Sequence, residues 1–287
     1  LRRLDGKFGF QNEFIYSKFE RTSNNLNEIK HPIIREALRL EGIEGIRLDY
    51  DADIPARTGL ATSSSFAVGL VNTLGAFKGE TRTKRELADK AIHIERVMCN
   101  EVGGIQDQIS SAFGGLNLIE FSKNGYDVHS VQLSKRRKLD FQTNLMLFYT
   151  KIQRTSSEIQ KKIKTPGEIN KNLLTLKQLA IEGYECLTNE KQNLDDFGQI
   201  LNEAWKSKKG LSDAVTTSFI DECYVKGLEA GALGGKVLGA GGGGFLLFYV
   251  PYSRQEAVRN ALSDLIEIKF CFEEQGSQIL LNFKDDP

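Results

Sequence analysis

The segment 55–65, which reads PARTGLATSSS, holds the residues best suited to chemistry. It follows a strand-like stretch and precedes apolar residues at helical spacing, so we expect it at the N-terminus of a helix. Unpaired N–H groups and the positive end of the helix dipole attract phosphate at such a place. Gly59 lets the backbone approach a ligand closely, and the hydroxyl residues 62–65 add hydrogen-bond donors.

A simpler interpretation of these hydroxyls is that one serine caps the helix. One cap needs one hydroxyl, and four in succession exceed that need, which favours a phosphate-binding loop. The chain has no G-x-x-x-x-G-K-[ST] motif, so a Walker-type loop is excluded.

A second glycine-rich stretch, GAGGGG (239–244), separates the apolar segments KVL and FLLFYV. A flexible linker is one interpretation, but apolar strands rarely flank a linker. A special turn that packs against a ligand or another backbone is favoured. Two acids, Glu95 and Asp107, lie on predicted helices, where each is by itself most simply a solvated charge.

Strand-like and helix-like segments interleave in the first half of the chain. TKRE (83–86) has the form of a capping box, and Asn124-Gly125 predicts a hairpin turn. The predicted strands are 45–55, 116–121, 126–133 and 144–149, and the predicted helices are 66–77, 83–98 and a short one within 100–115.

The second half is also mixed, and Gly210 is the predicted end of its second helix. The predicted boundary lies within 134–143, so we expect domains at 1–138 and 139–287. The helices are predicted at 155–188, 195–209, 216–233 and 253–265, and the strands at 266–272, 277–283 and on both sides of the glycine loop within 235–250.

Composition limits the classes of function. Of 287 residues, 40% are hydrophobic, and 38 basic residues balance 38 acidic ones, so charge gives no argument for nucleic-acid or membrane partners. The basic run 134–138 is most simply a solvated loop. Four scattered cysteines and three distant histidines predict neither a disulfide framework nor a zinc site. Without a signal peptide or an 18-residue apolar run, a cytoplasmic protein is expected.

Together these segments resemble the GHMP kinase superfamily, from about residue 31 to residue 283. The C-terminal glycine motif of that family is met by KVLGAGGGGF (236–245). The segments AIHIER and GIQDQ look like the bacterial D-glycero-D-manno-heptose 7-phosphate kinases within it. The central motif P-x-x-x-G-L-[GS]-S-S is met by Pro55, Gly59, Leu60, Ala61, Thr62 and Ser63.

The resemblance implies an α+β, two-domain fold: an N-terminal domain like a ribosomal protein and a ferredoxin-like C-terminal domain, with ATP between them. It also implies that Asp107 is the catalytic base and that Ser63 and Glu95 bind Mg²⁺. The implied nucleotide-binding residues are Pro55, Gly59, Leu60, Ala61, Thr62, Ser63, Ser64, Gly239, Ala240, Gly241, Gly242 and Gly243. Arg154 is a further candidate for phosphate binding, against its interpretation as a solvated loop charge.

Two departures from the family pattern bear on function. Ala61-Thr62 stands where the family usually has Gly-Ser, and Ala61 restricts the backbone. Nothing in the first 16 residues matches the family's opening R-x-P-x-R-like strand and its sugar-binding turn. Either the chain lacks its natural beginning or residues have been left out, so no acceptor-contacting residue is assigned there.

The implied activity is transfer of the γ-phosphoryl group of MgATP to the anomeric hydroxyl of the heptose phosphate, a small-molecule partner. A kinase of another acceptor, such as fucose, galactose or mevalonate, fits the same motifs. A catalytically silent sugar- or nucleotide-binding regulator and an inactive fragment are the remaining alternatives. The oligomeric state is left open.

Overall fold

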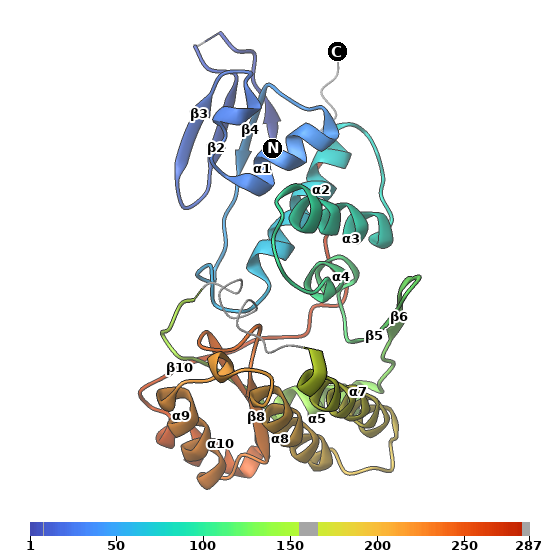
Figure 1. The fold of residues 1–287 in the computed structure, drawn as a ribbon, viewed down its shortest axis with the longest axis vertical. Helices are drawn as coiled ribbons and strands as arrows, with labels where there is room; N and C mark the ends of the chain where they lie inside the picture. Colours follow the sequence, from blue (N-terminus) through green and yellow to red (C-terminus); the bar gives the residue numbers. More distant parts are fainter. Residues whose placement is uncertain (8, 155–165, 283–287) are drawn as a thin grey trace. The chain divides into compact units, whose positions relative to one another are not determined.

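The computed structural model describes residues 1–7, 9–154 and 166–282, without the side chains of 166–170. It divides into two compact units (Figure 1). Unit 1 consists of Leu1–Pro55, Ala61–Gly114 and the described residues after Glu273. Unit 2 consists of Ala56–Leu60 and Gly115–Glu273.

The change of unit at Gly114–Gly115 lies upstream of the domain boundary expected between residues 138 and 139. That position falls inside helix α5 (Lys135–Thr143). Leu116 and Leu133, on either side of a hairpin, pack against a hydrophobic cluster of unit 2. The hairpin therefore belongs with the elements that follow it.

Unit 1 contains a four-stranded sheet in the order β1-β4-β2-β3, in which β2 and β4 run parallel and the other pairs antiparallel. Its elements are β1 (Arg2–Arg3), β2 (Asn12–Ile15), β3 (Phe19–Thr22), η1 (Leu26–Glu28), α1 (Pro32–Glu41), β4 (Ile46–Asp49), α2 (Thr62–Phe77), α3 (Lys84–Ile92), η2 (His93–Met98) and α4 (Gln106–Phe113).

Helix α2 is the centre of unit 1, because it packs against α1, α3 and α4. Its buried face includes Phe66, Leu70 and Leu74, at the spacing that predicts this helix. The capping box at 83–86 is confirmed: the Thr83 side chain accepts from the Glu86 N–H, and Glu86 bonds back. The helix predicted at 83–98 is confirmed over its length, but its last segment, η2, is a π-helix and not an α-helix.

Unit 2 contains an antiparallel sheet in the order β10-β7-β9-β8 and the separate hairpin β5-β6. Its elements are β5 (Asn117–Ser122), β6 (Gly125–Ser130), α5, β7 (Leu145–Tyr149), α7 (Pro166–Thr188), α8 (Asp195–Lys209), η3 (Asp213–Val215), α9 (Ser218–Glu229), β8 (Gly234–Val237), β9 (Phe245–Tyr249), η4 (Tyr252–Arg254), α10 (Gln255–Ala261) and β10 (Ile266–Ile268).

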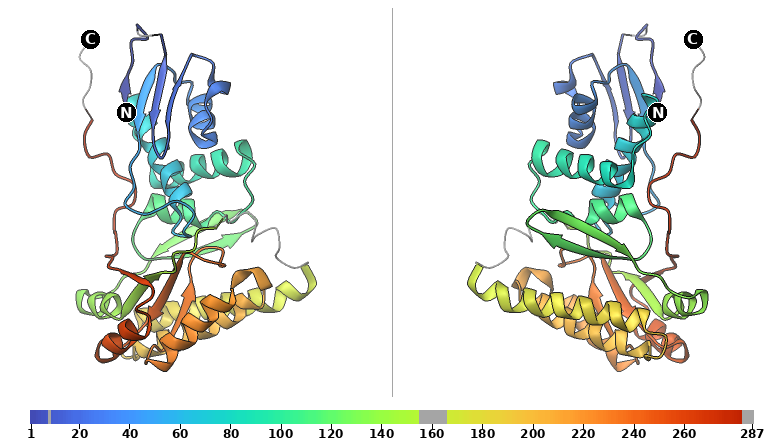
Figure 2. Two further views of the ribbon diagram at one scale, coloured as in Figure 1. Left: turned by 90° about the vertical axis from the view of Figure 1, so that its left-hand side faces the viewer. Right: turned by 90° about the vertical axis from the view of Figure 1, so that its right-hand side faces the viewer.

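Alternate residues of β7 and β9 form one face of this sheet, because side chains in a strand alternate between its two faces. Phe148 and Phe248 on that face join a cluster with Tyr224 of α9 and Val258 of α10. Helices α7 and α8 pack along each other, and both views of Figure 2 show them side by side. Helix α8 also packs against the edge strand β8.

Most of the predicted elements of unit 2 are confirmed, including the hairpin, the strand–loop–strand and the end of α8 at Gly210. The hairpin loop is Lys123-Asn124, since Gly125 already pairs with Ser122. Residues 155–165 of the predicted helix 155–188 lie outside the described residues.

The predicted strand 277–283 is wrong for its described part, because residues 277–282 form no strand. Leu280 and Leu281 are 88% and 78% exposed. An isolated strand with solvated apolar side chains and no neighbour to pair with has nothing to stabilise it. Residue 283 lies outside the described residues.

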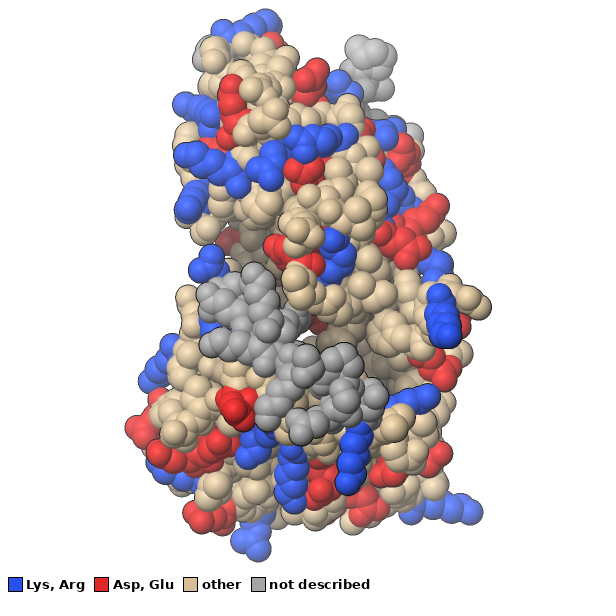
Figure 3. All heavy atoms as spheres, viewed as in Figure 1, with Lys and Arg blue, Asp and Glu red and all other residues tan. Residues whose placement is uncertain are grey.

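No helix within the described residues is long and apolar enough to cross a membrane. Basic and acidic side chains intermix over the face drawn in Figure 3. This pattern agrees with the balanced charge of the sequence.

A buried ion pair in unit 1 gives a test of this fold. The carboxylate of Glu41, with its side chain 2% exposed, accepts a 2.6 Å bond from Arg82, which is itself 5% exposed. Arg82→Met leaves the carboxylate without its nearest partner, and we expect the free energy of unfolding to fall by about 3 kcal/mol. Urea denaturation measures the loss. Arg136→Met, at an exposed ion pair, is the control and should change stability by less than about 1 kcal/mol; equal losses in both variants would contradict the assignment.

Candidate functional site

The N-terminus of α2 is not capped by a side chain. Ala61 is its N-cap residue, in the left-handed conformation (φ 56°, ψ 24°), and makes no side-chain cap bond. The first backbone bond of the helix runs from the Ser65 N–H to the Ala61 carbonyl at 2.9 Å. The capping interpretation of the hydroxyls therefore fails, and the N–H groups of the first turn remain directed out of the helix, as an anion site requires.

Ala61 holds this conformation at some cost in strain. A left-handed backbone is unfavourable by about 1–2 kcal/mol for a residue with a Cβ atom. A glycine would adopt it freely. The expected restriction at Ala61 thus corresponds to a real feature of the backbone at the start of α2.

Glu95 lies on the π-helical turn η2 and is 1% exposed. Its Oε1 accepts a 2.8 Å bond from Ser63 Oγ on α2, and its Oε2 accepts a 2.6 Å bond from Gln108 Nε2 on α4. One buried carboxylate thus joins three elements. Gln108 is fully buried, and within the described residues its Oε1 has no hydrogen-bond partner.

Asp107 is the second residue of α4 and is half-buried. Its backbone carbonyl accepts a 2.8 Å bond from Ser111 Oγ, which in turn lies 2.9 Å from Ser65 Oγ on α2. The hydroxyls of Ser65 and Ser111 thus link the first turn of α2 to α4. Over the described part of the chain, no hydrogen bond to the Asp107 carboxylate is recorded, so that group is available to a ligand.

The charges around Asp107 alter its acidity. Burial raises the pKa of Asp107, Arg96 opposes that rise, and Glu95 adds to it. Arg96 also donates two bonds to the Gly104 carbonyl, at 2.8 and 3.2 Å, and so holds the loop that leads into α4. Burial and Glu95 likewise raise the pKa of Glu101.

These carboxylates make the region suited to a divalent cation. Among the described residues no group of three His, Cys, Asp or Glu side chains converges as a metal site. Mg²⁺ does not require one, since it is usually bound by one or two carboxylates together with water and substrate phosphates. Ser63 Oγ and Glu95 Oε1 lie 2.8 Å apart, and both are oxygen atoms that can bind a metal ion, so they fit that pattern.

The first half of the hydroxyl-rich segment belongs to unit 2, where it packs against the glycine loop. Gly59 and Gly239 both have positive φ, and a Cβ added at Gly239 would lie 2.8 Å from the Gly59 Cα. A Cβ at Gly59 would lie 2.9 Å from the Leu238 carbonyl. The prediction that GAGGGG is a special turn packed against another backbone is confirmed.

The remaining predicted residues divide between the units in the same way. In unit 1, Pro55 is exposed, Thr62 is half-buried, and Ser64 is buried with 4% exposure. In unit 2, Leu60 precedes Ala61, the N-cap residue of α2, and residues 240–243 complete the glycine turn.

The sequence analysis did not identify three residues that position the site: Arg96, Gln108 and Ser111. Ser111 follows Asp107 by four residues, which places both on one helix face, and this spacing was a readable signal. Gln108 and Arg96 each adjoin a predicted site residue, but nothing in their types separates them from solvated polar side chains.

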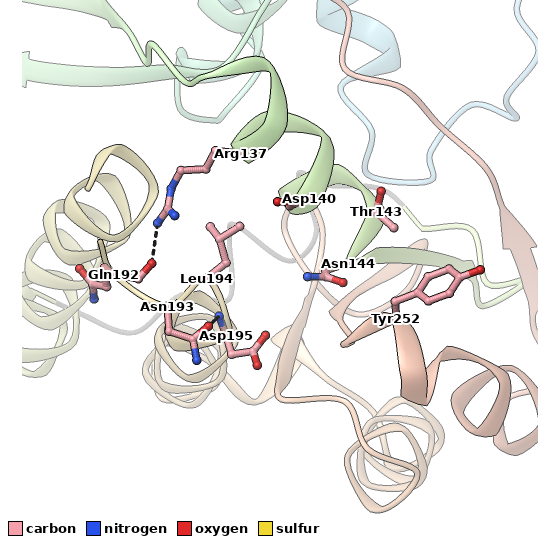
Figure 4. Close-up of a pocket in the computed structure, with 9 residues that line it drawn as sticks. All are labelled: Arg137, Asp140, Thr143, Asn144, Gln192, Asn193, Leu194, Asp195 and Tyr252. Carbon is pink, nitrogen blue, oxygen red and sulfur yellow. Dashed lines mark hydrogen bonds between the residues drawn. The ribbon is translucent and has the colours of Figure 1, made fainter. Parts of the chain in front are cut away.

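A surface pocket of unit 2 contains none of the predicted residues (Figure 4). Arg137 lines it, but donates to the carbonyls of Leu187, Cys186 and Gln192 at 2.7, 2.6 and 3.0 Å. Since the guanidinium of Arg137 is hydrogen-bonded to backbone segments, the pocket is best explained as part of the packing of unit 2. Its lining is Arg137, Asp140, Thr143, Asn144, Gln192, Asn193, Leu194, Asp195 and Tyr252.

Comparison with known proteins identifies matches in both halves of the chain. The family described as "GHMP kinases N terminal domain" matches residues 27–115, and "GHMP kinases C terminal" matches residues 184–267.

A D-glycero-alpha-D-manno-heptose 7-phosphate kinase from Campylobacter jejuni is 32% identical over 218 residues, 74% of this chain and 63% of the relative. An L-fucokinase/L-fucose-1-P guanylyltransferase from Bacteroides fragilis is 28% identical over 223 residues, 75% of this chain and 23% of the relative. The chain thus spans less than two thirds of the length of each. The crystal structure of a D-glycero-D-manno-heptose 1-phosphate kinase from Bacteroides thetaiotaomicron superposes with a TM-score of 0.73 at 24% identity, covering 92% of this chain and 81% of that one.

The raised pKa of Asp107 predicts a stability effect that does not depend on activity. Folding favours the protonated acid, so the contribution of Asp107 to stability falls as the pH rises from the ordinary value of 3.8 through the raised pKa. Asp107→Asn removes this penalty and should raise the melting temperature at neutral pH, with a gain that shrinks as the pH falls towards 4. Asp53→Asn, at an exposed position, is the control. A lower melting temperature for Asp107→Asn at pH 7 would contradict the prediction.

Proposed function

The chain belongs to the GHMP kinase family, and on that premise we propose that it transfers the γ-phosphoryl group of ATP to the anomeric hydroxyl of D-glycero-D-manno-heptose 7-phosphate. The two-domain GHMP kinase fold, with mixed helices and sheets, is the one that the sequence predicts. The choice of acceptor is supported by the Campylobacter jejuni relative, which is named for that sugar phosphate.

The observation that carries the proposal is the pair of hydrogen bonds at the Glu95 carboxylate. A buried carboxylate that accepts from Ser63 and from Gln108 fixes the first turn of α2 next to α4, the helix that bears Asp107. Phosphoryl transfer depends mainly on positioning and charge stabilisation. An uncapped helix N-terminus, a pair of oxygen ligands for a metal and an available carboxylate supply these functions.

The polyphosphate of ATP is bound, in this proposal, by backbone N–H groups of residues 59–64 and by the positive end of the α2 dipole. Gly59 and the glycines of 239–243 allow main chain to lie close to the phosphates. Ser63 and Glu95 hold Mg²⁺, which when bound offsets the negative charge on the phosphate oxygens.

Asp107 acts as the general base. Its carboxylate accepts the proton of the anomeric hydroxyl while the sugar oxygen forms a bond to the γ-phosphorus and the bond to the β-phosphate oxygen of ATP breaks. ADP leaves, and the product is the 1,7-bisphosphate. Arg96, which opposes the rise of the Asp107 pKa, helps keep the carboxylate ionised for this step.

A panel of acceptors tests the proposed function. ADP release should be fastest with D-glycero-D-manno-heptose 7-phosphate, with the product identified as the 1,7-bisphosphate by NMR. Faster turnover with fucose, galactose or mevalonate would keep the kinase and replace the acceptor. Tight ATP binding without product from any acceptor would identify a regulator and overturn the proposal.

Asp107→Asn tests the base within the same assay. We expect kcat to fall by about 10²–10⁴-fold, because proton transfer to a positioned base supplies that much. The Kd for ADP should stay within about threefold of wild type. Asp53→Asn is the control for loss of one carboxylate, and near-normal turnover of Asp107→Asn would remove this residue from the mechanism.

Glu95→Gln tests the metal assignment. The Mg²⁺ concentration that gives half-maximal velocity should rise by about tenfold or more, since even indirect partners of metal ligands contribute 10–100-fold. The amide keeps the size of the side chain, and circular dichroism checks that the fold persists. Glu44→Gln, at an exposed position of the same unit, should leave the Mg²⁺ titration unchanged; an unchanged titration for Glu95→Gln as well would exclude Glu95 as a ligand.

A further inference from the structure

Three basic side chains of unit 2 gather around the backbone that leads into the glycine loop. Lys208 lies near the end of α8, Lys236 is on β8, and Arg154 follows β7. All three are half-buried. Lys236 is the first residue of the glycine motif 236–245 and Arg154 is the phosphate-binding candidate of the sequence, whereas Lys208 belongs to neither family motif.

Lys208 is held at the start of the glycine loop. Its Nζ donates to the carbonyl oxygens of Val237 at 3.0 Å and of Gly239 at 2.6 Å. An ammonium group has three N–H donors. Two are directed at these carbonyls, so one is left for a ligand beside the loop.

The side chain of Arg154 also approaches the backbone that leads into the glycine loop, at Leu238. Its guanidinium lies 3.5 Å from the Leu238 carbonyl oxygen. Its Nη2 is 3.2 Å from the places that a Cβ would occupy at Gly59 and at Gly239. The guanidinium therefore lies where the two glycine segments touch.

Two of the three side chains, Lys208 and Lys236, have no acidic group acting on them among the described residues. Neither Lys208 nor Lys236 has a recorded ion pair there, whereas their neighbours Lys206 and Lys209 pair with Glu203 at 2.7 Å and Asp221 at 3.1 Å.

The cations also act on one another. Burial, together with Lys236 and Arg154, lowers the pKa of Lys208 to about 7. Burial lowers the pKa of Lys236 as well. Of the elements packed against α8, only β8 brings a charged group recorded as acting on Lys208; α7, β9 and η3 bring none in their described residues. Two partly buried lysines without an acidic partner among the described residues are an arrangement that a bound anion stabilises.

We propose that Lys208 and Lys236, with Arg154, form a binding site in unit 2 for a phosphate group, carried either by the nucleotide or by the acceptor as its own phosphate ester. A phosphate oxygen can take the remaining N–H of Lys208, and its charge offsets the repulsion among the three cations. The inference rests on the proposed function, which supplies both kinds of phosphate.

Binding of pyrophosphate, measured by calorimetry without turnover, tests the site directly. Lys208→Met and Lys236→Met should each weaken binding by about tenfold, the worth of one charge-assisted hydrogen bond. Lys206→Met removes a positive charge from the same helix at an exposed ion pair and is the matched control, with affinity expected within about twofold of wild type.

Proton uptake separates a ligand contact from a merely structural role. An anion favours the charged form of Lys208, so wild-type protein should take up a proton on binding at pH 8, and its affinity should fall as the pH rises from 7 to 9. Lys208→Arg stays charged over this range, so it should bind without that uptake. Should Lys208→Met fail to fold, Lys208→Arg and Lys236→Met still give a decision.

The source of the phosphate follows from two comparisons of ligands. If the variants weaken ADP much more than AMP, the site binds the nucleotide; if they weaken the heptose phosphate but not the free heptose, it binds the acceptor's phosphate. Either result supports the site.

Affinities of both lysine variants within twofold of wild type for pyrophosphate, ADP and heptose phosphate, with no proton uptake by wild type, would overturn it. If pyrophosphate binding weakens as expected while no sugar is phosphorylated, the site stands and the proposed function fails. Normal turnover of the heptose phosphate combined with unchanged binding in the variants would reject the site alone.

Discussion

The hydrogen bonds at the Glu95 carboxylate are the interaction on which the candidate site depends. A carboxylate with 1% exposure is stable only if its oxygens are satisfied, and here α2 and α4 each supply one donor. The π-helical turn that carries Glu95 places the side chain between these helices, and such turns are frequent at functional sites. The same bonds therefore hold unit 1 together locally and hold the candidate catalytic and metal-binding groups at a fixed spacing.

The glycine segments impose a second constraint, in unit 2. Main chain at Gly59 and main chain at Gly239 lie so close that a side chain at either would collide with backbone. This contact explains why both segments carry glycine. Lys208 and Arg154 bind backbone carbonyls within residues 237–239. The start of the glycine loop is therefore held by cations, and these positive charges favour an anionic ligand.

Local patterns in the sequence were sufficient for most elements, because caps and periodicity are local signals. Glu95, Ser63 and Asp107 were assigned roles only through the resemblance to the family, since each acid by itself has the pattern of a solvated charge. Local patterns were insufficient where the outcome depends on distant partners. The strand expected at 277–283 has the right residue types but no neighbouring strand in its described part. The packing of Leu116 and Leu133, which places the hairpin with unit 2, is likewise invisible in one dimension. Lys208 resembled any lysine at a helix end until the fold placed it against Val237 and Gly239.

The return of residues 274–282 to unit 1 has a consequence for biosynthesis. Ser277 accepts a 3.0 Å bond from Asn72 of α2, and the backbone at Gly276 lies against Gly114. A ribosome makes these residues only after all of unit 2, although domains generally fold in the order of their synthesis. The first unit to be started is thus the last to be completed, and its nascent form must wait, with part of its surface uncovered, until the other unit has been translated.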